Sequence, residues 1–166
     1  MAQSTYLLSV IIPFYNNERF INTCLYSLFS QIDDDVQVII IDDGSTDKSC
    51  YLITQFLLSD THRHVIFYRQ KNEGAAAARN RGLNFAKGKF ISFIDGDDVI
   101  SKNYYSIIKP LLIADHIDLI DFDYQKFANS PPEVQSTEAA QLVAYDFSTE
   151  GLACLLPLFH RSMWHV

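Results

Sequence analysis

The sequence has few cysteines, few basic residues and no long apolar run. Its 166 residues include only Cys24, Cys50 and Cys154, which lack the paired spacing of a zinc or redox site and indicate reduced thiols. No segment approaches the roughly 20 consecutive apolar residues that a membrane-spanning helix needs. The apolar start of the chain lacks the basic flank of a signal peptide and is interrupted at Pro13. We expect a cytoplasmic protein without a transmembrane segment, for which peripheral association with the inner face of the membrane stays open.

Basic residues are outnumbered by acidic ones. The 13 Lys and Arg against 20 Asp and Glu give a formal charge of −7, which argues against a nucleic-acid partner, because phosphate binding of that kind needs clustered basic side chains. Apolar residues are plentiful, at 48% of the chain with 12 Phe and 9 Tyr, which is enough for a sizeable core. The length indicates one ordinary domain or part of a larger protein.

Short apolar runs alternate with segments of helical spacing. The runs "LLSVIIP" at 7–13 and "VQVIIID" at 36–42 are apolar almost throughout, as in strands covered on both faces. The pattern predicts helices over 17–31, 46–59, 72–88 and 101–114, and further strands over 64–70, 89–95 and 117–124, the last near the edge of the sheet. This alternation predicts an α/β fold with three layers, α/β/α, around a mostly parallel central sheet.

The alternation stops after Tyr124. A polar connection containing Pro131 and Pro132 follows, and the chain then becomes apolar up to Val166. We therefore predict one domain over 1–124 and, over 125–166, a variable connection with the start of an incomplete further region. The fold is expected to be truncated at its C-terminus.

Polar clusters follow several of the predicted strands, and ligands of parallel sheets bind at the carboxyl ends of strands. In "IIIDDGSTDKS", Asp42 and Asp43 end a strand, Gly44 permits a tight turn, and Ser45 or Thr46 can cap the next helix. A plain junction between strand, turn and helix explains these residues equally well. Their position at the same sheet edge as the other clusters favours a function.

The segment "NEGAAAARNRG" predicts a slim helix start. Asn72 can cap this helix, Gly74 removes a side chain from its first turn, and the alanines let a ligand approach its N-terminal end. Backbone amides there suit a phosphate, and Arg79 could add a bidentate contact. The alternative is a packed alanine-rich helix in which Arg79 and Arg81 face water.

The stretch "FISFIDGDDVI" contains three carboxylates within four residues, Asp95, Asp97 and Asp98. Like charges at that spacing repel, so a partner is needed to compensate them. A calcium loop between two helices would need glycine at Ile100 and a carboxylate at Ser106, so that kind of site is excluded. Asp95 and Asp97 instead suit Mg²⁺ or Mn²⁺ that shares its coordination with substrate phosphates. An exposed acidic turn is the alternative.

Four motifs in order carry a resemblance to a known family. The segments "SVIIPFYNNERF", "IIIDDGSTDKS", "NEGAAAARNRGLNFAKG" and "FISFIDGDDVI", spread from about Ser9 to Tyr124, resemble the family 2 glycosyltransferases, whose nucleotide-binding domain has the Rossmann-like GT-A fold. The resemblance implies a metal-dependent, inverting transferase. Its donor would be a nucleotide-diphosphate sugar, most often UDP-linked, and its acceptor a saccharide or lipid-linked saccharide in bacterial surface polysaccharide synthesis.

The resemblance also implies roles for residues of the first two motifs. Pro13 and Tyr15 match positions that line the nucleoside pocket, and Glu18 is a weaker match. Asp43 matches the residue that hydrogen-bonds the base, while Asp42 is expected to support the turn beside it. All five are candidate nucleotide-binding residues.

The third and fourth motifs would supply the diphosphate and metal contacts. Arg79 matches a position near the diphosphate or the base. "DGD" matches the family's Asp-x-Asp motif, in which Asp97 would bind Mg²⁺ or Mn²⁺ directly and Asp95 would contact the ribose or, through water, the metal. The family's general base lies downstream, and no matching carboxylate pair occurs before Val166, so the base is unassigned and expected beyond that residue. A nucleotide- and metal-binding module without transferase activity is therefore the alternative function.

Overall fold

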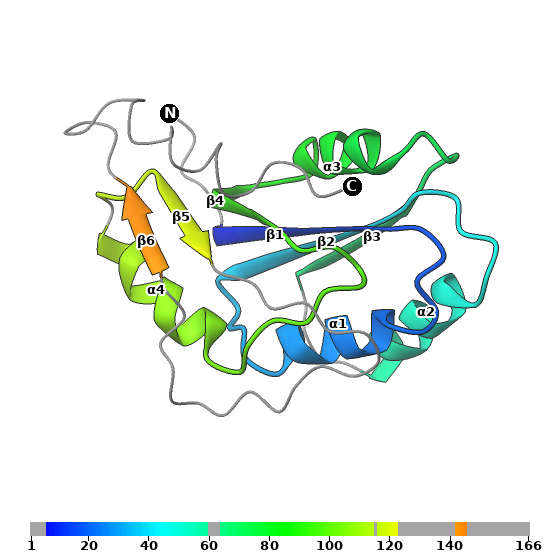
Figure 1. The fold of residues 1–166 in the computed structure, drawn as a ribbon, viewed down its shortest axis with the longest axis horizontal. Coiled ribbons are helices and arrows are strands. Elements are labelled where there is room, and N and C mark those ends of the chain that lie inside the picture. Colours follow the sequence, from blue (N-terminus) through cyan, green and yellow to red (C-terminus); the bar gives the residue numbers. More distant parts are fainter. Residues whose placement is uncertain (1–5, 60–63, 115, 123–141, 146–166) are drawn as a thin grey trace. The chain divides into compact units, whose positions relative to one another are not determined.

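The computed structural model describes residues 6–59, 64–114, 116–122 and 142–145. The chain divides into two compact units, Met1–Ser106 and Ile107–Val166. Along the first unit, strands and helices alternate as predicted (Figure 1). The elements are β1 (Tyr6–Phe14), α1 (Ile21–Phe29), β2 (Val36–Asp42), α2 (Ser49–Ser59), β3 (Val65–Arg69), α3 (Ala75–Leu83), β4 (Gly88–Phe93) and α4 (Tyr104–Ala114), which continues into the second unit.

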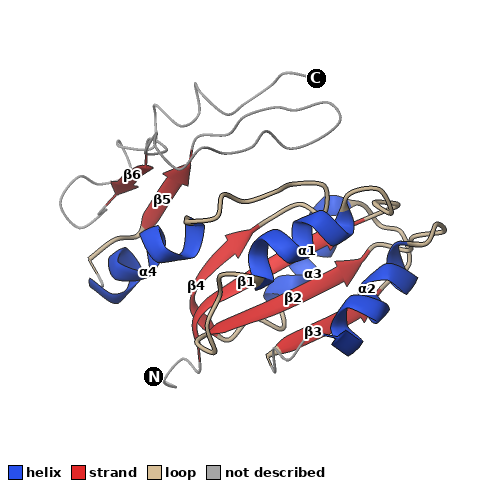
Figure 2. Ribbon diagram, turned by 90° about the horizontal axis from the view of Figure 1, so that it is seen from below, coloured by secondary structure: helices blue, strands red, loops and turns tan. Residues whose placement is uncertain are grey.

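The four strands of the first unit form one parallel sheet in the order β3-β2-β1-β4. All of β2, and β1 from Leu8 to Phe14, are buried, because both faces of these central strands are covered. Helix α3 lies on one face of the sheet, and α1 and α2 lie on the other (Figures 1 and 2). The predicted three-layer α/β fold with a mostly parallel sheet is therefore confirmed.

The strand order reverses between β1 and β4. The chain proceeds from β1 to β2 and β3 on one side, then returns to place β4 on the other side of β1. In open parallel sheets, the carboxyl ends of the strands at such a reversal border a crevice in which ligands bind. The end of β1, with the segments that follow β2 and β4, is therefore the first place to look for a site.

Helix α3 packs closely on the central strands because the residues on its inner face have small side chains or none. Ala78 lies in a buried cluster with Ile11, Ile39 and Ile41. A Cβ atom at Gly82 would lie 2.4 Å from Cγ2 of Ile11, so this position has no room for a side chain. These contacts hold α3 closely against β1 and β2.

The second unit contains a different kind of sheet. Strand β5 (Leu119–Phe122) pairs antiparallel with β6 (Leu142–Tyr145), with Leu119 opposite Tyr145. The prediction that the strand at 117–124 lies at the edge of the main sheet is wrong for the described residues, because its partner is this later segment. The predicted boundary after Tyr124 falls outside the described residues and stays a prediction. None of the helices within the described ranges is long and apolar enough to cross a membrane.

Candidate functional site

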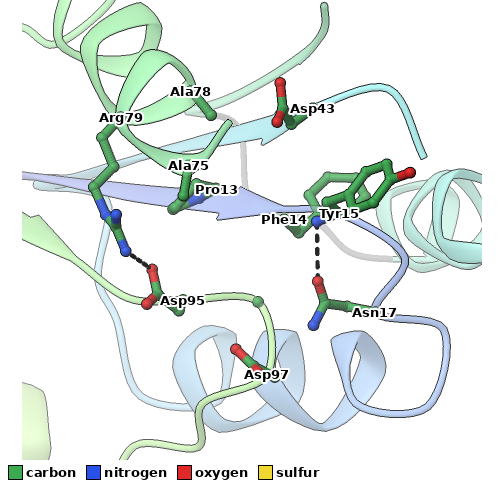
Figure 3. Close-up of a pocket in the computed structure, with 11 residues that line it drawn as sticks. Pro13, Phe14, Tyr15, Asn17, Asp43, Ala75, Ala78, Arg79, Asp95 and Asp97 are labelled. Atoms are coloured by element: carbon green, nitrogen blue, oxygen red, sulfur yellow. Dashed lines mark hydrogen bonds and ion pairs between the residues drawn. The ribbon is translucent and has the colours of Figure 1, made fainter. Parts of the chain in front are cut away.

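A cavity of about 240 Å³ lies at the carboxyl ends of β1, β2 and β4, where the strand order reverses. Figure 3 shows side chains from the segments after these strands, and from the first turns of α3, around one space. Its lining residues are Pro13, Phe14, Tyr15, Asn17, Asp43, Ala75, Ala78, Arg79, Asp95, Gly96 and Asp97. Six of these were predicted as site residues from the sequence: Pro13, Tyr15, Asp43, Arg79, Asp95 and Asp97.

The segment after β1 forms one wall of the cavity. Tyr15 is 45% exposed, and its backbone N–H donates a hydrogen bond to Oδ1 of Asn17 at 3.0 Å (Figure 3). Glu18, in contrast, does not line the cavity. Its carboxylate accepts from the backbone N–H of Lys48, and its own N–H donates to Oδ2 of Asp47, both at 3.0 Å. Glu18 therefore ties this segment to the start of α2, and its predicted nucleotide contact has no support from the geometry.

The carboxylate of Asp43 holds the turn that leads into helix α3. Asp43 is 3% exposed, and its oxygens accept hydrogen bonds from the backbone N–H groups of Glu73 at 2.9 Å and Gly74 at 2.8 Å, and from Nε2 of Gln70 at 2.8 Å. The prediction that Asn72 caps this helix is wrong, because α3 begins at Ala75 after Gly74, whose φ of 91° turns the chain. A buried carboxylate at a helix N-terminus is stabilised by the helix dipole.

Asp42 faces away from the cavity, into the turn that follows β2. It is fully buried, and it accepts hydrogen bonds from the N–H of Ser45 at 2.8 Å and from the thiol of Cys50 at 2.7 Å. Nε of Arg69 lies 3.1 Å from the same carboxylate. Burial and the bond to Asp42 raise the pKa of the Cys50 thiol to about 12. These contacts hold the turn together and leave no part of Asp42 in the cavity lining.

Arg79 and Asp95 join the two sides of the cavity. The guanidinium of Arg79, on α3, forms an ion pair with Oδ1 of Asp95, in the segment after β4 (Figure 3). Both side chains are partly exposed, at 34% and 44%. The alternative in which Arg79 simply faces water is therefore wrong. The pair places a positive charge beside the acidic residues that follow β4.

The negative charge of Asp95, Asp97 and Asp98 is only partly compensated. We call these residues with Gly96 the acidic turn. The exposed Asp97 carboxylate has no hydrogen bond or ion pair within the described residues. Burial, followed by the charges of Asp95 and Asp97, raises the pKa of Asp98. Burial and the three carboxylates together raise the pKa of the neighbouring Cys24 thiol to about 12.

The acidic turn fits a divalent cation that takes further ligands from a bound molecule. Among the described residues, no group of three or more His, Cys, Asp or Glu side chains could hold a metal ion by itself. Mg²⁺ and Mn²⁺ do not need such a group, because one or two carboxylates commonly bind them together with phosphate oxygens. Asp97 and Asp95 both line the cavity and supply such a pair.

Some lining residues were missed by the sequence analysis. Phe14 and Gly96 meet beneath the cavity, where a Cβ atom on Gly96 would lie 2.6 Å from Cβ of Phe14. Asn17 supports Tyr15, and Asn16 between them has a positive φ of 53°. The consecutive asparagines after Tyr15 were a usable signal, because asparagine tolerates the left-handed region better than most residues.

Comparisons with known proteins identify the family of this chain. A parallel sheet with a cavity where its strand order reverses is typical of α/β proteins that bind nucleotides. The family model of Glycosyl transferase family 2 matches residues 9–155. The uncharacterized glycosyltransferase YibD of Escherichia coli K12 is 39% identical over 119 residues, which cover 72% of this chain and 34% of YibD. This chain belongs to glycosyl transferase family 2.

The names of other similar proteins state an activity, a substrate or a bound ligand. WfgD of Escherichia coli, a UDP-Glc:alpha-D-GlcNAc-diphosphoundecaprenol beta-1,3-glucosyltransferase, is 29% identical over 95% of this chain and 62% of its own length. TarS 1–349 of Staphylococcus aureus in complex with UDP-GlcNAc has a TM-score of 0.61 at 29% identity, over 68% of this chain and 32% of TarS. The mannosyltransferase PcManGT of Pyrobaculum calidifontis has the same TM-score at 21% identity, over 69% of this chain and 35% of PcManGT, and so shares the fold. The chain spans about a third of the length of YibD and of TarS 1–349.

Proposed function

We propose that this chain is the donor-binding part of a metal-dependent, inverting glycosyltransferase. The donor is a nucleotide-diphosphate sugar, UDP-linked, and the acceptor is a saccharide or lipid-linked saccharide in bacterial surface polysaccharide synthesis. One observation carries the proposal: aromatic, cationic and acidic side chains line a single cavity where the strand order reverses. The UDP-GlcNAc bound by TarS supports the choice of nucleotide, and the lipid-linked acceptor of WfgD supports the choice of acceptor.

The nucleoside would bind between the end of β1 and Asp43. Tyr15 offers an exposed aromatic ring, and Pro13 adds an apolar surface beside it. Oδ1 of Asp43 already accepts two hydrogen bonds, but Oδ2 accepts only the one from Gly74 among the described residues. Oδ2 therefore has capacity to accept a hydrogen bond from an N–H of uracil.

The diphosphate would lie between α3 and the acidic turn. Arg79 supplies a guanidinium for phosphate oxygens, and the amides of the first turn of α3 have no acceptor within the helix. Asp97 would hold the divalent cation, with Asp95 beside it. When bound, the cation supplies charge stabilisation to the departing nucleoside diphosphate. Binding would require Arg79 to divide its interaction between Asp95 and the phosphates.

Among the described residues that line the cavity, no carboxylate is left for the general base. Asp43 is assigned to the turn before α3 and to the nucleoside, and Asp95 and Asp97 to the cation. The base that deprotonates the acceptor would therefore lie outside this set of lining residues. The same assignment of carboxylates favours, as a second candidate, a module that binds nucleotide and metal but transfers nothing by itself.

Calorimetric titration with UDP, in Mn²⁺ and in chelator, tests the proposed donor site. Wild type should bind UDP in Mn²⁺, and Asp97→Ala should weaken this binding by at least about 100-fold, because it removes the direct metal ligand. Asp34→Ala is the matched control, since Asp34 is an exposed carboxylate just before the amino end of β2, whereas the cavity lies at the carboxyl ends of the strands. Unchanged binding in Asp97→Ala would contradict the metal assignment. Absence of binding by wild type to UDP and to a panel of other nucleotides would contradict the donor-binding proposal itself.

A further inference from the structure

We propose that Asn16 is a positioning residue that holds Tyr15 in the wall of the cavity. It does so by linking the loop after β1 to the loop after β2. The link consists of the hydrogen bonds between Asn16 and Glu18 on one side and the segment Ser45–Lys48 on the other, and we call it the loop clasp. The inference rests on the proposed function, because it concerns how the nucleoside end of the cavity is kept in shape.

The loop clasp begins where the backbone pairing of β1 and β2 ends. The last register pair is Phe14 with Asp42, and the N–H of Asp43 still donates to the carbonyl of Phe14 at 2.9 Å. Beyond this point the two segments are joined by the side chains of Asn16 and Ser45. The loops would otherwise diverge, since they lead to different helices, α1 and α2.

Asn16 is the centre of the loop clasp. Its backbone N–H donates to Oγ of Ser45 at 3.0 Å. Its side-chain Oδ1 accepts from the N–H of Thr46 at 2.8 Å and from the N–H of Asp47 at 3.3 Å. Ser45 is 2% exposed, so the first of these bonds reaches the protein interior. A single carboxamide therefore satisfies consecutive backbone donors of the neighbouring loop.

The backbone conformation of Asn16 is unusual. Its φ of 53° makes it the only non-glycine residue with a positive φ in the described part of the chain. Such a conformation costs free energy and persists only where surrounding contacts enforce it, which is common beside functional sites. The contacts of the loop clasp are those that enforce it here.

Cavity residues and clasp residues alternate along the loop. Tyr15 and Asn17 line the cavity and are joined by the Tyr15 N–H bond to Asn17 Oδ1, whereas Asn16 and Glu18 bond to the other loop. Asn16 does not itself line the cavity. Its effect on a bound nucleoside must therefore pass through Tyr15, whose direction depends on the turn at Asn16.

Three substitutions separate the two properties of Asn16. Asn16→Asp keeps an acceptor oxygen and tolerates a positive φ. Asn16→Gly keeps the positive φ but loses the acceptor, and Asn16→Ala loses both. If the position of Tyr15 depends on the acceptor oxygen, Asn16→Asp should keep the UDP affinity that Asn16→Gly and Asn16→Ala lose.

The experiment combines titration with amide hydrogen exchange. We expect UDP affinity in Mn²⁺ to fall about tenfold in Asn16→Gly and further in Asn16→Ala, and to stay within about threefold of wild type in Asn16→Asp. Mn²⁺ affinity without nucleotide, measured by electron paramagnetic resonance, should not change, because the acidic turn lies outside the loop clasp. In the absence of any ligand, the amide hydrogen of Thr46 should exchange faster in Asn16→Gly and Asn16→Ala than in wild type or Asn16→Asp.

The control is Asn84→Gly, which makes the same change at an exposed asparagine with an ordinary φ of −66°. It should leave UDP affinity and Thr46 exchange unchanged.

Wild-type UDP affinity in Asn16→Gly and Asn16→Ala would overturn the proposal, as would an equal loss of UDP and Mn²⁺ binding, which would indicate general destabilisation. Unchanged Thr46 exchange would overturn the loop clasp even if UDP did not bind at all. Failure of UDP to bind wild type, with Thr46 exchange as expected, would instead count against the proposed donor and leave the loop clasp supported.

Discussion

The loop clasp stands behind the cavity wall at Tyr15, whereas the acidic turn lines the cavity itself, and the two differ in how their polar groups are satisfied. In the loop clasp, backbone donors of one loop meet side-chain acceptors of the other, as Asn16 does for Thr46 and Asp47. In the acidic turn, Asp97 has no partner among the described residues, and the pKa of Asp98 is raised by burial and by its acidic neighbours. The polar groups of the loop clasp are satisfied within the protein, whereas we propose that a bound cation compensates the acidic turn.

This difference suggests different tasks for the two regions. A preformed wall loses little conformational entropy on binding, so it suits recognition of a rigid nucleoside. Clustered carboxylates repel one another until a cation arrives, so their free energy depends on what is bound. Binding at the acidic turn should therefore respond strongly to charge, whereas binding against Tyr15, which the loop clasp supports, should respond to geometry.

The largest effect within this comparison is expected from Arg79→Gln. The substitution removes the positive charge that pairs with Asp95, so Mn²⁺ alone should bind about tenfold more tightly, while UDP in the presence of Mn²⁺ should bind about tenfold more weakly. Paramagnetic resonance and calorimetry measure the two affinities. Arg81→Gln is the control, because Arg81 lies on the same helix but stacks over the ring of Tyr68. Weaker Mn²⁺ binding in Arg79→Gln would show that Arg79 does not compete with the cation.

An intermediate effect is expected from Gln31→Ala, which tests how the acidic turn is held. Nε2 of Gln31 donates to the carbonyls of Ser27 at 2.6 Å and Ser101 at 2.9 Å, and its Oε1 accepts from the N–H of Tyr105 at 3.0 Å. Loss of these three bonds should lower the free energy of unfolding by about 1–3 kcal/mol. It should also weaken Mn²⁺ binding several-fold without changing the affinity for UMP in chelator.

Urea unfolding and Mn²⁺ titration provide the two readouts for Gln31→Ala. The control is Gln55→Ala, an exposed glutamine on α2. Equal weakening of UMP and Mn²⁺ binding would mean that Gln31 supports the whole unit instead of the acidic turn.

The smallest effect is expected from Asp98→Asn and depends on pH. A carboxyl group whose pKa is raised on folding binds its proton more tightly in the folded state, so stability falls as pH rises from the ordinary value of 3.8 through the raised one. The substitution removes this cost. In metal-free buffer the variant should be more stable than wild type at about pH 7 and equal to it at about pH 3, where Asp98 is protonated in both states. An equal difference at both pH values in urea unfolding would contradict the titration of Asp98.

Much of the first unit could be predicted from the sequence because its strands are buried on both faces. The apolar runs in β1 and β2 are almost continuous, whereas the helix between them has its buried residues at helical spacing. The reversal of strand order was not predicted, since it depends on which side of β1 the chain returns to. The lining of the cavity by Tyr15, Asp43 and Arg79 followed from the rule for strand ends and from family resemblance.

The errors concern contacts between distant segments. Asn72 was predicted to cap α3 because it precedes the helix, but the N-cap is Gly74, and the turn before the helix is held by Asp43, from the end of another strand. Asn16 was not recognised because its acceptors and donors belong to a loop about thirty residues away. Strand β5 was assigned to the main sheet because its partner β6 lies in a connection whose composition gave no clear strand signal. Local patterns do not contain such information.

The contact between Gly82 and Ile11 limits how this helix can change over evolution. Any side chain at position 82 would have to displace the branched side chain of Ile11, and would lift the helix that carries Arg79. Single mutations at this position would therefore disturb the site before any compensation could appear. A side chain at position 82 would be tolerated only after a smaller residue had replaced Ile11. We therefore expect substitutions at positions 11 and 82 to occur as a pair and in that order.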